Sequence, residues 1–248
     1  MTERKKEALM TIALLTAAGS GTRMHQDIPK QFIHVDNKPV IIHTMEAFQK
    51  HPGIDAIIVV TIASWTDVLR AYARQFNISK LKWIVPGGET GQESIFNGLR
   101  TLKEDSEVPE DAIVMVHDGN RPMVSSMIIS DSLATYSMHG SAVAVIPCTE
   151  VVFESDDGIS SCTSTERERL FRTQTPHTYL LNDLYEAHLE AHKRGITGTA
   201  ASCMLMKELG KTTWFSKGSE ENLKITTLDD LRIFKALLHT AQDNWIKE

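Results

Sequence analysis

The sequence predicts an α/β fold built on a mostly parallel sheet. Short, continuous apolar runs of strand length recur along its 248 residues, and stretches with apolar residues at helical spacing lie between them. Strands that alternate with helices in this way form parallel sheets through right-handed crossovers. Continuous apolar runs are also typical of parallel strands covered on both faces. We therefore expect helices on both sides of one sheet.

The expected elements alternate regularly as far as Pro147, which closes the last apolar run of this part of the chain. Strands are expected at 12–15, 56–60, 81–85, 112–116 and 142–146. Helices are expected at 38–48, 65–76, 92–102 and 128–136.

The rhythm changes after residue 150. The segment 151–172 is polar and contains the turn Ser155-Asp156-Asp157-Gly158, which predicts a protruding β-arm, a hairpin between two short strands. Helices are expected beyond it at 181–193, 202–209 and 228–238, with strands at 212–215 and 222–226. Thr227 and Asp230 fit a capping box that begins the last helix. We expect one domain, 1–248, with an arm at about 150–172.

Composition limits the classes of function. The hydrophobic content of 42% and the formal net charge of −6 indicate a globular protein and argue against a general nucleic-acid binder. The three cysteines are far apart and odd in number, which favours a reducing compartment. No apolar stretch approaches transmembrane length, so we expect a cytoplasmic protein without a membrane partner.

The first strand runs into the glycine loop Thr16-Ala17-Ala18-Gly19-Ser20-Gly21-Thr22-Arg23-Met24, and Lys30 follows shortly after it. Glycines allow backbone N–H groups to turn toward an anion, and two nearby cations can neutralise phosphate charge. A dinucleotide fingerprint would need a third glycine where Met24 stands, and no P-loop lysine follows. The loop indicates a triphosphate site, with a plain surface turn as the alternative.

Two more loops follow expected strands. They contain Gly88 and Asp118, and ligands of parallel sheets bind at the carboxyl ends of strands. We therefore expect the loops of Gly19, Gly88 and Asp118 to meet at one crevice. Asp118 offers carboxylate oxygens to a metal or substrate, and a simple turn-capping role is the alternative.

These motifs, in this order, resemble the 2-C-methyl-D-erythritol 4-phosphate cytidylyltransferases and the related ribitol-5-phosphate cytidylyltransferases. The resemblance extends from Ala17 to the final helix. The matching blocks are 17–23, 29–32, 87–88 with Ser94 and 98–99, 117–118 with 121–122, 174–176 and 222–226.

The resemblance implies the Rossmann-like three-layer nucleotidyltransferase fold and a homodimer. It also implies transfer of CMP from CTP to a polyol phosphate, with Mg²⁺ and release of pyrophosphate. Arg23, Lys30 and Lys224 would be the catalytic residues, because they can neutralise charge on the α-phosphate and the leaving group. No general base is needed, since a phosphate dianion is already a nucleophile, and His117 and His177 are interpreted as structural.

The other site residues also follow from the resemblance. Arg121, Arg167 and Thr175 would hold the polyol phosphate, partly from the other subunit's arm, although Arg167 also fits a solvated charged run. Asp118 would bind the metal. The nucleotide would be bound by Ala17, Ala18, Gly19, Gly21, Thr22, Gly88, Glu89, Ser94, Asp118 and Gly119, with Gly88, Glu89 and Ser94 reading cytosine and ribose.

The sequence departs from the family pattern mainly in the acceptor half. Gly91 replaces an arginine, Gly119-Asn120 replace two alanines, Glu150-Val151 replace Asp-Thr, and Ala200-Ala201-Ser202 stand near a usual Thr-Asp-Asp. We name 2-C-methyl-D-erythritol 4-phosphate first as acceptor, which would mean isoprenoid precursor synthesis. Ribitol 5-phosphate, for cell-wall or surface polysaccharide synthesis, is the close alternative. A non-catalytic CTP-binding protein is a further alternative, and a nicotinamide-dependent oxidoreductase is disfavoured by Met24.

Overall fold

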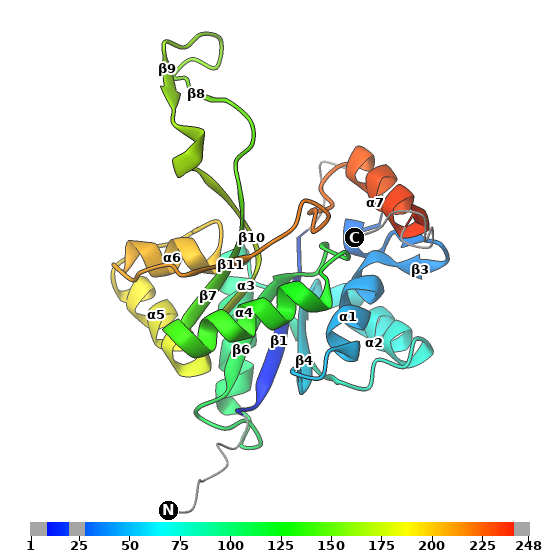
Figure 1. Cartoon of the computed structure of the whole chain (residues 1–248). Coiled ribbons are helices and arrows are strands. Elements are labelled where there is room, and N and C mark those ends of the chain that lie inside the picture. The colour runs from blue at the N-terminus through cyan, green and yellow to red at the C-terminus, as the bar shows by residue number, and fades with distance from the viewer. Residues whose placement is uncertain (1–8, 20–27, 241–248) are drawn as a thin grey trace, which may run out of the picture.

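A seven-stranded sheet forms the centre of the computed structural model, which describes residues 9–19 and 28–240 (Figure 1). The strand order is β11-β7-β10-β6-β1-β4-β5. In chain order, the strands are β1 (Thr11–Ala17), β4 (Ala56–Thr61), β5 (Leu81–Pro86), β6 (Ile113–Asp118), β7 (Ser141–Pro147), β10 (Phe171–Leu180) and β11 (Phe215–Lys217).

Strand β10 is the main element that the sequence did not predict. It pairs antiparallel with both β6 and β7, whereas the other recorded pairings of this sheet are parallel. Its first half, Phe171 to Pro176, is polar and holds a proline, so it shows no continuous apolar run. The proline lies where the register shifts between Thr173 and His177, a position where its missing N–H breaks no ladder bond.

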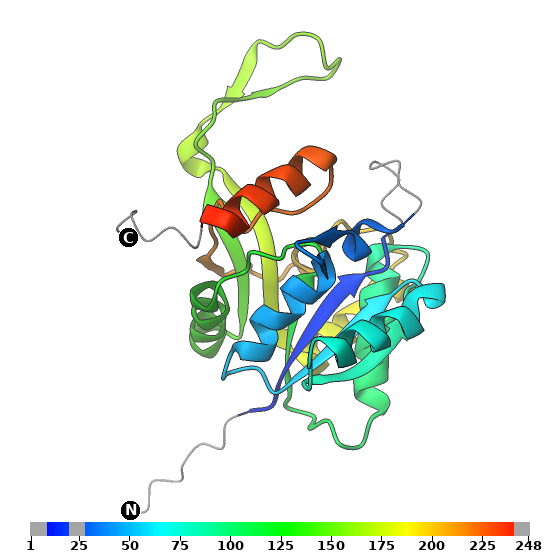
Figure 2. The same cartoon turned by 90° about the vertical axis from the view of Figure 1, so that its right-hand side faces the viewer.

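Helices cover both faces of the sheet, which confirms the expected α/β fold (Figures 1 and 2). In β1, Ala13 and Leu15 belong to one buried cluster, while Ile12 and Leu14 belong to the other, because alternate side chains of a strand point to opposite faces. One face carries α1 (Val40–Lys50), α2 (Thr66–Gln75) and α4 (Ser126–His139), and the other carries α3 (Gly91–Glu104), α5 (Leu181–Lys193) and α6 (Ser202–Glu208).

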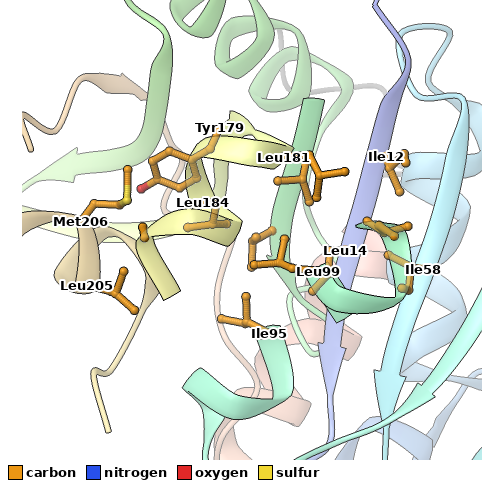
Figure 3. Close-up of a cluster of buried hydrophobic side chains, with 14 of the residues drawn as sticks. Ile12, Leu14, Ile58, Ile95, Leu99, Tyr179, Leu181, Leu184, Leu205 and Met206 are labelled. Carbon is orange, nitrogen blue, oxygen red and sulfur yellow. The ribbon is translucent and has the colours of Figure 1, made fainter. Parts of the chain in front are cut away.

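The larger cluster fixes α3 and α5 against the sheet (Figure 3). Leu14, Leu99 and Leu184 are each fully buried in it. Burial of one such leucine contributes about 1.5–3 kcal/mol to stability. The amino-terminal end of α3, which faces the crevice described below, therefore has a rigid base.

Local signals set several element ends. The helix expected at 38–48 begins at Val40, because residues 34–39 form a small hairpin of β2 (His34–Val35) and β3 (Lys38–Pro39). Its turn residues Asp36 and Asn37 have φ of 50° and 63°, as this tight turn requires.

Two expected strands near the carboxyl terminus differ from the structure. The strand expected at 212–215 is β11, which begins at Phe215, and the segment 222–226 is not a strand. Short 3-10 turns occur at Lys30–Phe32, Ala63–Trp65 and Arg167–Arg169.

The polar segment after β7 forms the predicted hairpin. Its strands are β8 (Val152–Glu154) and β9 (Thr163–Thr165), which project well beyond the sheet (Figures 1 and 2). Asp157 closes the loop between them by accepting hydrogen bonds from the backbone N–H groups of Ile159 and Ser160, each at 2.9 Å.

Helix α7 (Leu228–Thr240) packs beside the small β2–β3 hairpin (Figure 1). The predicted capping box is confirmed: Asp230 N donates to Thr227 Oγ1 at 3.2 Å, and Thr227 N donates to Asp230 Oδ2 at 2.7 Å. A small buried cluster of Phe234, Ile225, Val35 and Val40 attaches the helix. Within the described residues, no helix combines the length and apolar character needed to cross a bilayer.

We predict that Phe234→Ala releases α7 while the main sheet stays folded. Removal of a fully buried phenylalanine costs about 3–5 kcal/mol, and here the loss falls on a cluster separate from the two large ones. Hydrogen exchange should accelerate for the amides of α7 but not for those of β1. Equal acceleration in both elements would contradict this prediction.

Candidate active site

A cavity of about 870 Å³ lies at the carboxyl ends of the central strands. Gly19, Gly88 and Asp118 all line it, so the three loops meet at one crevice as the strand order predicts. Of the predicted site residues, the following also line it: Ala17, Ala18, Lys30, Glu89, Ser94, Arg121, Thr175 and Lys224.

Five of the predicted residues, among them Arg167, are placed differently or lie outside the described residues. Gly21, Thr22 and Arg23 belong to the segment 20–27, which is not described. Gly119 does not line the cavity. It packs behind the loop, where an added Cβ would lie 2.7 Å from Ile41 Cδ1.

Arg167 lies on the exposed arm and does not line the cavity of its own chain. Its Nε donates to Glu168 Oε1 at 3.1 Å. This contact fits the alternative interpretation of Arg167 as part of a solvated charged run. A contribution of Arg167 to the site of a partner subunit stays a prediction.

Asp118 is the electrostatic centre of the crevice. It ends β6, and its carboxylate contacts two cations, one near in sequence and one distant. Arg121 Nε lies 2.9 Å from Oδ2, and Lys224 Nζ, 106 residues further along the chain, lies 2.9 Å from Oδ1. Burial by itself would raise the pKa of the Asp118 carboxyl, but the charges and hydrogen bonds of Lys224 and Arg121 outweigh it and hold the pKa well below its usual range. The carboxylate is therefore ionised under all ordinary conditions.

Thr175 supports this loop through its hydroxyl. The Oγ1 atom accepts from Asp118 N at 3.1 Å and lies 2.9 Å from His117 Nδ1. Because His117 Nε2 faces the carbonyl of Arg121 at 3.2 Å, the proton of the ring belongs on Nε2, and Nδ1 accepts from Thr175. Thr175 thus has both hydroxyl functions occupied by the protein, so a direct role in holding substrate, as predicted, would require this network to rearrange.

The Gly88 loop is shaped by close packing. An added Cβ at Gly87 would overlap Ala18 Cβ, so the absence of a side chain lets the second loop approach the first. Gly88 N donates to Ser94 Oγ at 3.1 Å, and Glu89 N donates to Glu93 Oε2 at 2.7 Å. These bonds order the loop that is predicted to read the base.

Several polar residues of the crevice were not identified from the sequence. Gln31 Nε2 donates to the carbonyls of Ala17 and Gly19, at 2.5 Å and 3.3 Å, and so fixes the start of the glycine loop. His188 and Ser202 also line the cavity, and His188 Nε2 and Ser202 Oγ are buried without a partner among the described residues. Gln31 had a sequence signal as a neighbour of Lys30 in a matching block, and Ser202 as part of the departure at 200–202, whereas His188 had none.

A family model for 2-C-methyl-D-erythritol 4-phosphate cytidylyltransferase (IspD) matches residues 11–240 of the chain. The chain belongs to the IspD family. The ribitol-5-phosphate cytidylyltransferase of Lacticaseibacillus paracasei is 39% identical over 94% of this chain and 100% of its own length. A 2-C-methyl-D-erythritol 4-phosphate cytidylyltransferase of Clostridium botulinum is 35% identical over 91% of this chain and 96% of its own length.

Solved structures agree with the family assignment. The 2-C-methyl-D-erythritol 4-phosphate cytidylyltransferase of Francisella tularensis has a TM-score of 0.76 and 27% identity, over 92% of this chain and 99% of that one. A synthase from Anaerococcus prevotii, with a TM-score of 0.79 and 22% identity over 94% and 97% of the two chains, shows the fold. This IspD-family chain is therefore a nucleotidyltransferase that transfers a cytidylyl group to a polyol phosphate.

Three buried histidines predict acid sensitivity. Burial lowers the pKa of His117 to about 3 and the pKa values of His177 and His188 to about 4. In the unfolded chain these groups titrate near 6.5, so below that pH the unfolded state takes up protons that the folded state does not. The free energy of unfolding should fall as the pH drops from about 6.5 to 4, by at most about 1.4 kcal/mol per pH unit for each histidine.

Urea unfolding at a series of pH values between 7 and 5 measures this slope. The variant His188→Gln should lower the number of protons taken up on unfolding by about one, and so make the slope shallower. The matched control for loss of an imidazole is His192→Gln, on the exposed side of the same helix. A free energy of unfolding that is constant between pH 7 and 5 would refute the expectation.

Proposed function

We propose that this enzyme transfers CMP from CTP to ribitol 5-phosphate and releases pyrophosphate. The observation that carries the proposal is the 39% identity to a ribitol-5-phosphate cytidylyltransferase over that relative's whole length, compared with 35% for a relative that acts on methylerythritol phosphate. This order reverses the preference drawn from the motifs. Methylerythritol phosphate stays the second candidate, since the family model carries its name.

The proposed chemistry is an in-line attack of the acceptor's phosphate on the α-phosphorus of CTP. Phosphoryl transfer of this kind depends on positioning and on neutralising charge. Lys30 and Lys224 both line the crevice, so each fits a role in neutralising charge on the triphosphate. Arg23 would act beside Lys30. Lys224 is held by Asp118 in this structure and would exchange that contact, in whole or in part, for phosphate oxygens.

Arg121 is the best placed cation for the acceptor's phosphate. Its Nε donates to Asp118 at 2.9 Å, and its Nη1 donates to the backbone carbonyl of Asn222 at 2.6 Å. A guanidinium has five N–H donors, so this fixed side chain keeps further donors for a ligand. Two anchored bonds also orient the fork before the substrate arrives.

We assign Mg²⁺ to Asp118 as part of the same proposal. Mg²⁺ is commonly bound through one or two carboxylates together with substrate phosphates and several waters. The described residues contain no cluster of three or more metal-ligating side chains, which suits an ion that arrives with the nucleotide better than one held by protein alone. When bound, the ion would neutralise charge on the phosphates, and Asp118 would supply its protein ligand.

The arm supports a homodimer. Val151, Phe153 and Ile159 are exposed on it by 68%, 62% and 91%. Apolar side chains on a projecting hairpin suit contact with a second copy of the chain. In such a dimer Arg167 could reach the partner's crevice.

A pyrophosphate-release assay with CTP tests the acceptor. We expect ribitol 5-phosphate to give a kcat/KM at least tenfold above those of 2-C-methyl-D-erythritol 4-phosphate, glycerol 3-phosphate and xylulose 5-phosphate. A site that bonds particular hydroxyl groups discriminates strongly against analogues that lack them. Faster turnover of methylerythritol phosphate would overturn the proposed acceptor and leave the reaction class intact.

Replacement of Lys30 tests the proposed catalytic centre. Lys30→Ala should lower kcat by about 100-fold or more, as loss of a charge-stabilising donor does elsewhere, with little change in thermal stability. Lys82→Ala, an exposed lysine on β5 away from the cavity, is the matched control and should retain full activity. Undiminished turnover by Lys30→Ala would refute its role.

A further inference from the structure

Lys224 reaches the crevice from a segment without regular secondary structure. Residues 218–227, here called the strap, run from β11 to α7 across the carboxyl ends of the sheet strands (Figure 1). Lys224 Nζ lies 2.9 Å from Asp118 Oδ1, yet no ladder of backbone bonds fixes the strap. Something else must therefore position this lysine.

The first half of the strap is fixed to β10 by amide side chains. Gln174 makes two bonds to Ser219, with Nε2 2.7 Å from its carbonyl and Oε1 3.1 Å from its N–H. Asn222, which is fully buried, donates from Nδ2 to the carbonyl of Thr175 at 2.8 Å. These contacts anchor the strap before Lys224.

The anchor after Lys224 comes from Asn120. The N–H of Ile225 donates to the carbonyl of Asn120 at 2.9 Å, and Asn120 Nδ2 donates back to the carbonyl of Ile225. Both residues are buried, with exposures of 6% and 0%. A reciprocal pair of this kind fixes the peptide next to Lys224 in position and orientation.

Asn120 also lies two residues after Asp118, the partner of Lys224. The same short loop therefore holds the lysine's backbone through Asn120 and its ammonium group through Asp118. An alanine at position 120 would offer no side-chain donor to the carbonyl of Ile225. The anchor of the peptide next to Lys224 therefore depends on the amide of Asn120.

We infer that Asn120 is a positioning residue that sets the place of Lys224 for cytidylyl transfer. The inference rests on the proposed function, in which Lys224 neutralises charge in the transition state. Small displacements of such a group cost rate, because stabilisation in the transition state depends on geometry fixed in advance. Loss of Asn120 should then act on kcat rather than on binding of CTP.

The experiment compares Asn120→Ala in two backgrounds, wild type and Lys224→Met, by pyrophosphate release. In the wild-type background, kcat should fall about tenfold while KM for CTP changes less than twofold, since a displaced Lys224 loses stabilisation of the transition state rather than binding of the nucleotide. In the Lys224→Met background, Asn120→Ala should lower the remaining kcat less than twofold, because the group that it positions is gone.

The controls separate positioning from folding. Asn182→Ala removes another asparagine that makes a contact between elements, to Lys103 Nζ at 3.0 Å and away from the cavity, and should retain full kcat. If Asn120→Ala fails to fold, Asn120→Ser supplies the same comparison with a smaller cavity.

Two outcomes would overturn the inference: an unchanged kcat in Asn120→Ala, or an equal tenfold loss in both backgrounds. Full activity of Lys224→Met would instead contradict the proposed role of Lys224, so the two failures are distinguishable.

Discussion

The crevice depends on one half-buried carboxylate. Asp118 balances the charges of Arg121 and Lys224. Arg121 belongs to the loop that follows Asp118, and Lys224 belongs to the strap, about a hundred residues further along the chain. Without this anion, Arg121 and Lys224 would lose the shared partner that holds both side chains at the end of β6. The same ion pairs keep both cationic side chains ordered before any phosphate binds. A triphosphate can then replace contacts that already exist, rather than order mobile lysine and arginine side chains.

A second, neutral network supports this centre. His117 and Thr175 bond to each other and to the backbone of the Asp118 loop, and burial keeps the imidazole uncharged. A charged imidazole here would compete with Arg121 for the carboxylate. The histidine of the His-Asp motif therefore serves the geometry of the aspartate and needs no part in proton transfer. This agrees with a reaction in which the nucleophile is an ionised phosphate.

Close packing and local bonds fix the Gly88 side of the crevice. Gly87 lies against Ala18, and Gly88 N donates to Ser94 Oγ at 3.1 Å. The segment that contains Ala200 and Ser202 is joined to the same side, because Thr199 N donates to Gln92 Oε1 at 3.0 Å, near the start of α3. The Asp118 loop and Lys224 complete the lining of the crevice.

The sequence by itself determined the α/β class, the parallel strands and the convergence of three loops, because each rests on short-range patterns of apolar residues and on the common end at which parallel strands stop. The motif blocks also placed Lys30, Asp118, Arg121 and Lys224 in one functional set. Only the tertiary structure decided that β10 runs antiparallel through the middle of the sheet, since its polar first half and its proline conceal a strand. Likewise, the bonds of Asn120 to Ile225 and of Thr175 to His117 join residues 105 and 58 positions apart, and no local pattern specifies such pairs. Contacts of that separation exist only after the sheet has brought its loops together.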